Sequence, residues 1–311
     1  MKISPIYSNN LYNQKCSTKI NQPDFKCNCR VITDRMGNLQ YRSTTSFFRG
    51  DLNWTQMAKF FGDKFKNVDK VNVLNYGCSS GEETYSIIMS LIKTLGKQAE
   101  KFFPIIAKDI DGENIDDAKN GVLYANIMEK TLIENLLSKK ETTIDSNSVY
   151  QACLNHYANN IVPQIEKLRD INKYVRIKVN EDNNDKKWAK YRDKNVYEVK
   201  VQKFLKERAN FSIGNILYDI HSVPDKNTII FARNMWPYIR KDQQTRLLNF
   251  IYNKFHNKNS YIVFGDYDDA YSYTSMVPYY NGTYTDNGSY VKFCIDRYNF
   301  QETGLRNIFK I

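Results

Sequence analysis

The residues best suited to chemistry form a short segment rich in glycine, serine and glutamate, Gly77-Cys78-Ser79-Ser80-Gly81-Glu82-Glu83. It follows an apolar run at 71–76 and precedes a stretch at 82–95 whose apolar residues recur at helical spacing. A glycine turn between a strand and a helix lets the backbone approach a ligand, and N–H groups at the start of the helix bind polar ligand atoms. The segment predicts a site for a nucleotide-like ligand.

Two adjacent glutamates narrow the choice of ligand. The dinucleotide fingerprint requires G-x-G-x-x-G, whereas this segment places Glu82 and Glu83 where a pyrophosphate would lie. Carboxylates at that position suit a cofactor with a cationic amino group and a sulfonium, as in S-adenosylmethionine. The alternative is that both glutamates only stabilise the helix N-terminus through its dipole.

A further acid, Asp109, stands at the end of the next predicted strand. Doubly wound nucleotide-binding folds place an acid there to bind the ribose hydroxyls. The distance in sequence from Gly81 is longer than the roughly 20 residues of the dinucleotide fingerprint. Asp109 could instead cap the helix that follows, but Asp111 is better placed for that role.

Hydrophobic periodicity predicts the elements that must position these residues. A strand, the glycine turn, a helix, a second strand and a short helix ending near residue 120 form one βαβ unit, which is typical of a doubly wound, mostly parallel α/β sheet. Asp51 is predicted to cap a helix over residues 52–65. Strands are predicted at 71–76, 103–108, 196–201, 211–213, 228–232 and 261–264, a helix at 242–255, and a terminal strand pair near 276–277 and 290–295.

The chain divides into two predicted parts. Residues 1–43 show no sustained periodicity and carry an excess of Lys and Arg, so we expect a basic, irregular leader. Residues 44–311 are predicted to form one domain with an insertion or subdomain at about 121–195. Within the insertion we expect helical segments at 132–137 and 150–168.

Composition limits the classes of protein. The net charge of +11 suits an acidic partner, a nucleic acid or an anionic membrane surface, or reflects a chain rich in lysine throughout. Nucleic-acid binding rests on charge alone, because no reader motif is present. No apolar run is long enough for a membrane span and the start lacks a secretory signal, so we expect a cytoplasmic protein. The six cysteines lack zinc-site spacing, so we expect no metal.

Five ordered motifs resemble those of one family, the CheR-type chemotaxis receptor methyltransferases, which are protein-glutamate O-methyltransferases. The glycine segment, continuing Thr84-Tyr85-Ser86-Ile87, is similar to that family's G-C-S-T-G-E-E-P-Y-S-I. The other four are Thr45-Ser46-Phe47-Phe48-Arg49 (T-x-F-F-R), Asp109-Ile110-Asp111 (D-I-D), Asn215-Ile216-Leu217 (N-L-L), and Phe231-Ala232-Arg233-Asn234 with Tyr238 (F-C-R-N-x-x-x-Y). The resemblance implies a class I, Rossmann-like methyltransferase fold.

The resemblance also implies roles for single residues. A glutamate γ-carboxylate of a partner protein would attack the methyl group of S-adenosylmethionine, leaving S-adenosylhomocysteine. Arg49 and Tyr238 would orient that carboxylate, with Arg233 at the cofactor end of the site. Glu83 and Glu82 would hold the methionine portion, Asp109 the ribose, and Asn215 with Ile216 the adenine. The motifs place Thr45, Gly77, Cys78, Ser79, Gly81, Ile110, Arg233 and Asn234 at the cofactor as well.

Other interpretations stay open. Arg49 and Arg233 could form surface ion pairs, and Tyr238 could be a core residue. The chain departs from the family pattern around partner recognition: a helical N-terminal domain is not predicted, and the insertion begins with a helical pattern where the family has a small β-subdomain. The partner could be a chemoreceptor or another acidic protein. A non-catalytic scaffold or sensor that binds the cofactor is one alternative, and an amino methyltransferase is another.

Overall fold

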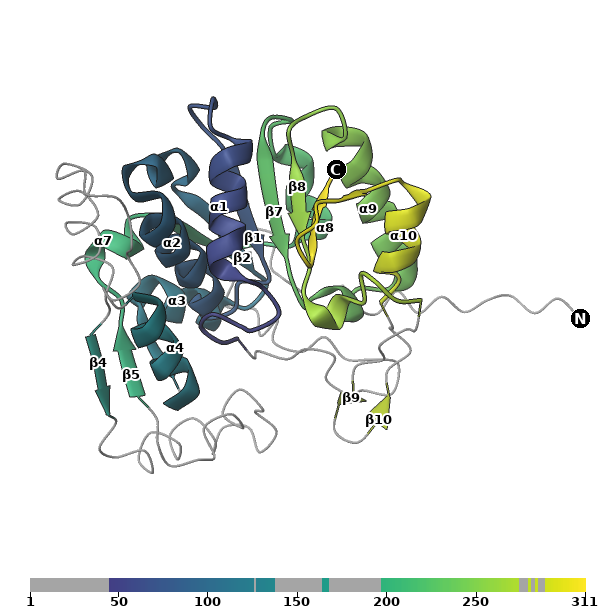
Figure 1. Ribbon diagram of the computed structural model, residues 1–311. Helices are drawn as coiled ribbons and strands as arrows, with labels where there is room; N and C mark the ends of the chain where they lie inside the picture. The colour runs from purple at the N-terminus through teal and green to yellow at the C-terminus, as the bar shows by residue number, and fades with distance from the viewer. Residues whose placement is uncertain are drawn as a thin grey trace, which may run out of the picture.

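A seven-stranded sheet forms the centre of the molecule (Figure 1). The computed structural model describes residues 45–125, 127–137, 164–167, 197–273, 279–280, 283–284 and 289–311. The strand order is β11-β12-β8-β7-β1-β2-β6. The strands are β1 (Asn72–Tyr76), β2 (Ile105–Asp109), β6 (Ala209–Ile213), β7 (Thr228–Ala232), β8 (Tyr261–Val263), β11 (Gln301–Glu302) and β12 (Ile308–Lys310).

Strand direction confirms the predicted doubly wound α/β fold. The strands from β6 to β8 are parallel to their neighbours, whereas β12 runs antiparallel to β8 and β11 antiparallel to β12. The chain leaves β1 for β2 and β6 on one side and later builds β7 and β8 on the other. Ligands of such sheets bind beyond the carboxyl ends of the strands, where the strand order reverses. The reversal here lies between β1 and β7.

Helices cover both faces of the sheet because successive strand residues point to opposite sides. Ile229 and Phe231 of β7 pack in one core with α1 (Trp54–Lys64) and α2 (Glu82–Leu95). Ile230 lies in a second core with α9 (Lys241–Phe255). The other helices in the described residues are α3 (Gly112–Asn120), α4 (Ile127–Leu137), α7 (Lys203–Lys206), α8 (Ile216–Asp219) and α10 (Val291–Arg297). All five residues of β7 are buried, as expected of a strand covered on both sides.

A small antiparallel sheet corrects two predictions about the insertion. It has the order β3-β5-β4, with β3 (Val122–Ala125), β4 (Gln164–Lys167) and β5 (Tyr197–Lys200). The strand expected at 196–201 thus belongs to this sheet and not to the main one, and residues 164–167 are a strand where a helix was expected. Short segments carry too few periods to separate these cases. The helix expected at 132–137 is confirmed within α4.

Two further predictions were wrong. Residues 290–295 were expected to be a strand, but α10 begins at Val291. Its buried residues Val291, Cys294 and Ile295 recur at helical spacing, which the prediction overlooked. The cap of α1 is Asn53, whose side chain accepts a hydrogen bond from the Gln56 N–H, and not Asp51. The leader at 1–43 and the strand expected at 276–277 lie outside the described residues.

The remaining elements are short. They are the hairpin β9 (Tyr279–Tyr280) and β10 (Thr283–Tyr284) and the 3₁₀ helices η1 (Gly96–Phe102), η4 (Ile220–Ser222), η5 (Trp236–Tyr238) and η6 (Asp266–Asp268). In the part of the chain that the structure describes, no helix has the length and apolar character needed to cross a membrane. The same residues contain no group of three His, Cys, Asp or Glu side chains that could hold a metal ion.

Candidate cofactor and methyl-transfer site

The glycine loop joins β1 to α2 and is pinned to the carboxyl end of β2. The Gly77 and Cys78 N–H groups donate to the carbonyl oxygen of Lys108, at 2.8 and 3.1 Å. Gly81 has a φ of +98°, and a Cβ added there would lie 3.0 Å from the Ala118 Cβ. Both the left-handed backbone and the close approach to α3 therefore require glycine at position 81.

Asp109 braces this loop from the end of β2. Its Oδ2 accepts a hydrogen bond from the Ser79 N–H at 2.7 Å, and its Oδ1 accepts one from the Asp111 N–H at 2.9 Å. Burial raises the pKa of Asp109 to about 6, against the lowering effect of these N–H groups. Asp111 caps α3 by accepting from the Glu113 N–H, as predicted. The contact of Asp109 with a ribose stays a prediction.

The two glutamates occupy the first turn of α2 and are both buried. Glu82 accepts a hydrogen bond from the Ser80 hydroxyl at 2.9 Å. Glu83 Oε2 accepts from Arg233 Nη1 at 2.8 Å, and no partner of Oε1 is found among the described residues. Burial raises the pKa of Glu83, whereas Arg233 and Arg49 lower it. A glutamate that only complemented the helix dipole would need none of these contacts.

Arg233 follows β7 and lies between two carboxylates. Its side chain has no exposed surface; Nη1 binds Glu83, Nη2 binds Asp51, and the guanidinium carbon lies 5.1 Å from the centre of the Trp54 ring. The alternative that Arg233 forms an ion pair at the surface is therefore wrong, because its side chain is fully buried. Asp51, whose expected role was a helix cap, is one residue of this cluster that the sequence analysis missed. Its partner is 182 positions away, so sequence spacing gives no signal of the pair.

Arg49 reaches the same cluster from the segment before α1. That segment is held against two helices, because the Phe48 N–H donates to the Ser86 hydroxyl of α2 at 2.9 Å and the Phe47 N–H to Glu129 of α4 at 3.1 Å. Arg49 is half-buried, and its charge contributes to lowering the pKa of Glu83. Thr45, also predicted at the cofactor, is buried in this segment.

The turn after Arg233 is fixed by Asp268, a second residue that the sequence analysis missed. Asp268 accepts hydrogen bonds from the N–H groups of Asn234 (2.6 Å), Gly265 (2.7 Å) and Trp236 (3.1 Å). Burial nevertheless raises its pKa to about 7. The side chain of Asn234, predicted at the cofactor, accepts from the Tyr267 N–H and donates to Asp51 at 3.4 Å. Asn234 has a φ of +57°, which asparagine tolerates.

Tyr238 ends the short helix η5, which packs beside the glycine loop. Trp236 at the start of η5 is buried and donates from Nε1 to the Ala232 carbonyl at 2.8 Å. Met235, just before η5, lies 3.6 Å from the position that a Cβ on Gly77 would take. This turn and the glycine loop thus share one edge of the sheet. Tyr238 itself is half-buried, and its contact with an acceptor stays a prediction.

The residues predicted at the adenine follow β6, next to Asp109. The Gly214 N–H donates to the Asp109 carbonyl at 2.9 Å. Asn215 caps α8 by accepting from the Leu217 N–H at 3.0 Å, and Ile216 is buried in the core. Ile110, after β2, is half-buried. The structure brings these segments to the carboxyl edge of the sheet, beside Asp109, and their contact with adenine stays a prediction.

These groups suit a cationic cofactor. The buried Ser79 hydroxyl oxygen lacks a hydrogen-bond partner among the described residues, as does Glu83 Oε1. Both are acceptors for a ligand ammonium or hydroxyl. The Cys78 thiol is fully buried. Burial is the main cause that raises its pKa well above the ordinary value, and the nearby acids Asp109 and Glu83 raise it further. Cys78 is therefore a neutral packing residue of the loop and not a nucleophile.

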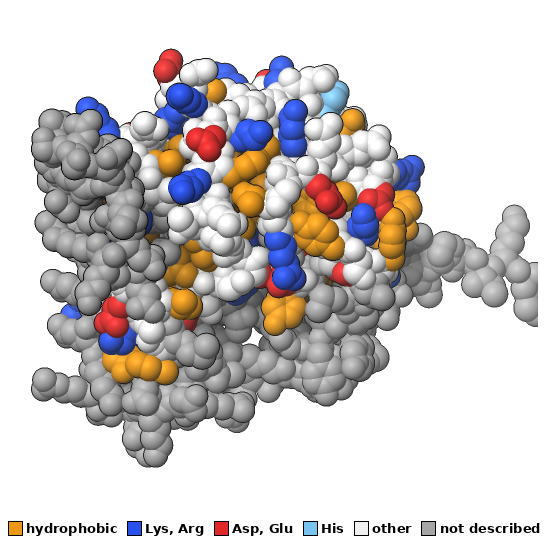
Figure 2. Space-filling view, viewed as in Figure 1, with side chains coloured by type: hydrophobic (Ala, Val, Ile, Leu, Met, Phe, Trp, Pro, Cys, Tyr) orange, Lys and Arg blue, Asp and Glu red, His pale blue; other side chains and the backbone are white. Residues whose placement is uncertain are grey.

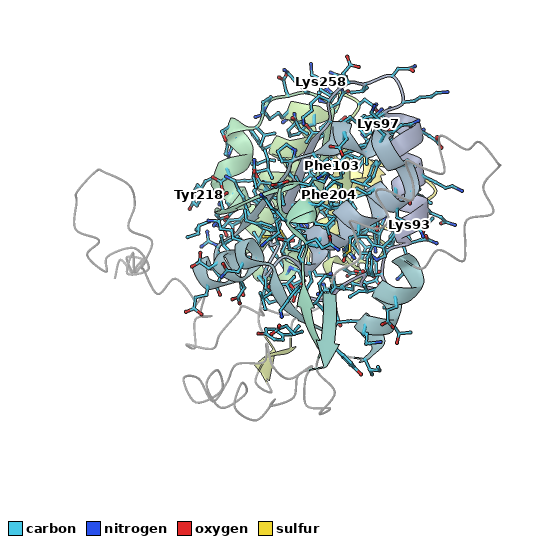
Figure 3. The ribbon with its side chains drawn as sticks, turned by 90° about the vertical axis from the view of Figure 1, so that its left-hand side faces the viewer. Lys93, Lys97, Phe103, Phe204, Tyr218 and Lys258 are labelled. Atoms are coloured by element: carbon cyan, nitrogen blue, oxygen red, sulfur yellow. The ribbon has the colours of Figure 1, made fainter. Side chains whose placement is uncertain are left out.

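Two surface cavities formed by described residues lie away from this edge. One, of about 420 Å³, lies beside Tyr85 and Phe211, and the other, of about 430 Å³, is lined by asparagines and by Lys70, Lys226 and Lys258. Lys258 precedes β8 and marks the amino edge of the sheet, at the top of Figure 3. Figure 2 shows Lys and Arg side chains along the upper part of the molecule. Neither cavity is lined by a residue predicted at the cofactor.

Residues 43–162 match the family model described as "CheR methyltransferase, SAM binding domain". No curated protein matches the chain. Among solved structures, it is similar to the methyltransferase domain of bacterial CtHen1-CN, with 9% identity and a TM-score of 0.32 over 83% of this chain and 98% of that chain. It is also similar to the plantazolicin methyltransferase BamL, with 14% identity and a TM-score of 0.29 over 70% and 47%. It is similar as well to the glycopeptide N-methyltransferase MtfA complexed with S-adenosylmethionine, with 8% identity and a TM-score of 0.30 over 77% of this chain and 66% of that chain.

Proposed function

We propose that this chain methylates the side-chain carboxylate of a glutamate in a protein. Its residues 43–162 match the S-adenosylmethionine-binding domain of CheR methyltransferases, and it is an S-adenosylmethionine-dependent methyltransferase. The observation that carries the proposal is the position of Arg49, a cation close enough to Glu83 to lower its pKa. A guanidinium there can bind a carboxylate acceptor through charge-assisted hydrogen bonds.

The chemistry asks little of the protein besides binding and orientation. When bound, S-adenosylmethionine supplies an electrophilic methyl group, and S-adenosylhomocysteine remains after the transfer. A glutamate carboxylate is already ionised at pH 7, so no general base is needed. Glu83 and Ser79 would hold the cofactor, and Arg49 and Tyr238 would align one acceptor oxygen. The rate gain then comes from proximity and preorganised charge.

The amino methyltransferase alternative fits the geometry less well. An amide that recognises a planar amino group needs its oxygen and nitrogen available to the substrate. The Asn234 amide oxygen accepts from the Tyr267 N–H at 3.1 Å and its nitrogen donates to Asp51 at 3.4 Å. One acceptor position and one donor position of that amide are therefore used within the protein.

The partner that we propose is an acidic protein in the cytoplasm, such as a chemoreceptor. Support comes from the net charge of +11 and from the resemblance of five motifs. A protein of opposite charge would be steered to the enzyme, and this steering weakens with salt. The methylation rate of a true acceptor should therefore fall as ionic strength rises.

The test combines binding with transfer. Calorimetric titration measures the affinity for S-adenosylmethionine, and incubation with the methyl-labelled cofactor and acidic protein fractions measures label that is released as methanol at alkaline pH. We expect Arg49→Ala to bind the cofactor within about threefold of wild type and to lose at least about tenfold in transfer, because a hydrogen bond to a charged group is lost. Arg240→Ala, an exposed arginine paired with Asp242, is the matched control. If wild type binds S-adenosylmethionine but transfers no methyl group, and Arg49→Ala behaves in the same way, the result would support a non-catalytic scaffold instead.

A further inference from the structure

The guanidinium of Arg233 is divided between two carboxylates. Nη1 donates to Glu83 Oε2 at 2.8 Å and Nη2 binds Asp51 Oδ1, while the buried Nε has no partner among the described residues. Arginine commonly binds one carboxylate through two parallel hydrogen bonds. Here each carboxylate receives only one of the terminal nitrogens.

Asp51 is held in place from three other segments of the chain. Its Oδ2 accepts from the Asp266 N–H at 3.2 Å and from Asn234 Nδ2 at 3.4 Å. Its carbonyl oxygen accepts from Asn307 Nδ2 at 3.1 Å. These contacts fix the carboxylate of Asp51, and through it they fix the Nη2 side of the guanidinium.

The division leaves Glu83 with one oxygen available. Oε2 is bound to Arg233, and Oε1 has no partner among the residues that the structure describes. The Glu83 side chain is 11% exposed, so it is nearly enclosed. The cations Arg233 and Arg49 both lie near Glu83, but Oε1 accepts no hydrogen bond from the described residues. A nearly enclosed carboxylate oxygen without a donor favours a ligand that donates a hydrogen bond, such as an ammonium group.

We propose that Asp51 is a positioning residue that keeps Glu83 available to the ammonium group of the cofactor. By holding Nη2, Asp51 prevents Arg233 from taking both Glu83 oxygens. Without Asp51, the guanidinium would turn to form a two-point pair with Glu83, and the charge of that glutamate would be satisfied within the protein. This inference rests on the proposed role of Glu83 toward the methionine portion of S-adenosylmethionine.

A double-mutant cycle on cofactor binding tests the proposal. The dissociation constant for S-adenosylmethionine is measured by calorimetry for wild type, Asp51→Ala, Glu83→Gln and the double variant. We expect each single variant to weaken binding about tenfold or more, and the double variant to be within about twofold of Glu83→Gln, because Asp51 acts through Glu83. Asp225→Ala, which removes an exposed partner of Lys258, is the control and should bind as wild type does.

Two results would overturn the proposal. The first is a dissociation constant for Asp51→Ala that equals that of wild type. The second is a double variant whose fold-change in the dissociation constant equals the product of the two single fold-changes, as a general structural role of Asp51 would give. If Asp51→Ala does not fold, the cycle is run with Asp51→Leu, which is close in size and removes the acceptor of Nη2. The readout needs no methyl acceptor, so failure of the proposed carboxylate transfer leaves this test intact. A wild-type chain that does not bind the cofactor would instead remove the role of Glu83 itself and with it the proposal.

Discussion

Replacing Arg233 with leucine removes the cation that lies between Glu83 and Asp51. The side chains of these acids are 11% and 6% exposed, and that of Arg233 is 0% exposed. Removing one partner of a buried pair costs about 3–5 kcal/mol, because the remaining charge is left buried and unpaired. The lost contact with the Trp54 ring at 5.1 Å adds about 0.5–1 kcal/mol. We expect Arg233→Leu to destabilise the fold by about 4 kcal/mol at pH 8.

The pH dependence of this loss separates charge from packing. Burial raises the pKa of Glu83 and Arg233 is the main group that lowers it, so without Arg233 this pKa rises further and the variant loses stability as pH rises through it. Urea unfolding of both proteins at pH 5 and pH 8 should show a smaller difference in the free energy of unfolding at pH 5, where Glu83 of the variant becomes protonated. Arg246→Leu, which removes an exposed pair with Asp242, should change stability by less than about 0.5 kcal/mol. An Arg233→Leu deficit that is equal at both pH values would refute the charge argument.

Three further predictions concern the loops of the same edge. Gly81→Ala should lower the free energy of unfolding by about 2–4 kcal/mol, because the backbone has a φ of +98° and the added Cβ would lie 3.0 Å from Ala118. Gly304→Ala, with a φ of +81° and no neighbour within 4 Å, should show the backbone effect alone, and thermal unfolding measures both variants. Asp268→Asn removes a carboxyl group whose pKa is raised by burial to about 7. As pH rises from 4 to 8, the free energy of unfolding of wild type should therefore fall by up to about 4 kcal/mol relative to that of the variant. Urea unfolding measures this difference, and a difference that stays constant with pH would contradict the raised pKa. Tyr238→Phe should lower kcat about tenfold and leave cofactor affinity within about twofold, because only a hydrogen bond to the acceptor is removed; equal losses in both would place Tyr238 at the cofactor instead.

Local patterns predicted the part of the site that lies close in sequence. The glycine loop combines an apolar strand, a turn and a helical period, and β1 and α2 lie where these patterns place them. Asp111 caps α3 as its position before the helix indicates. In these cases the residues that decide the structure are neighbours in the chain.

Pairing across the sheet was beyond the reach of local patterns. Asp51 and Arg233 meet only because β7 lies beside β1 and the segment before α1 crosses the start of α2. Asp268 binds three N–H groups that lie 3, 32 and 34 positions away. A carboxylate that accepts from the backbone has no partner of opposite charge to reveal it in the sequence. The short strands of the small sheet offered too few residues for their period to be read.

Identification of the methylated atom tests the central claim most directly. The wild-type chain is incubated with methyl-labelled S-adenosylmethionine and an acidic acceptor protein, and the modified peptides are sequenced by mass spectrometry before and after alkaline treatment. We predict methyl groups on glutamate side chains that are lost as methanol at alkaline pH. Methyl groups that survive this treatment and lie on amino groups would contradict carboxylate transfer.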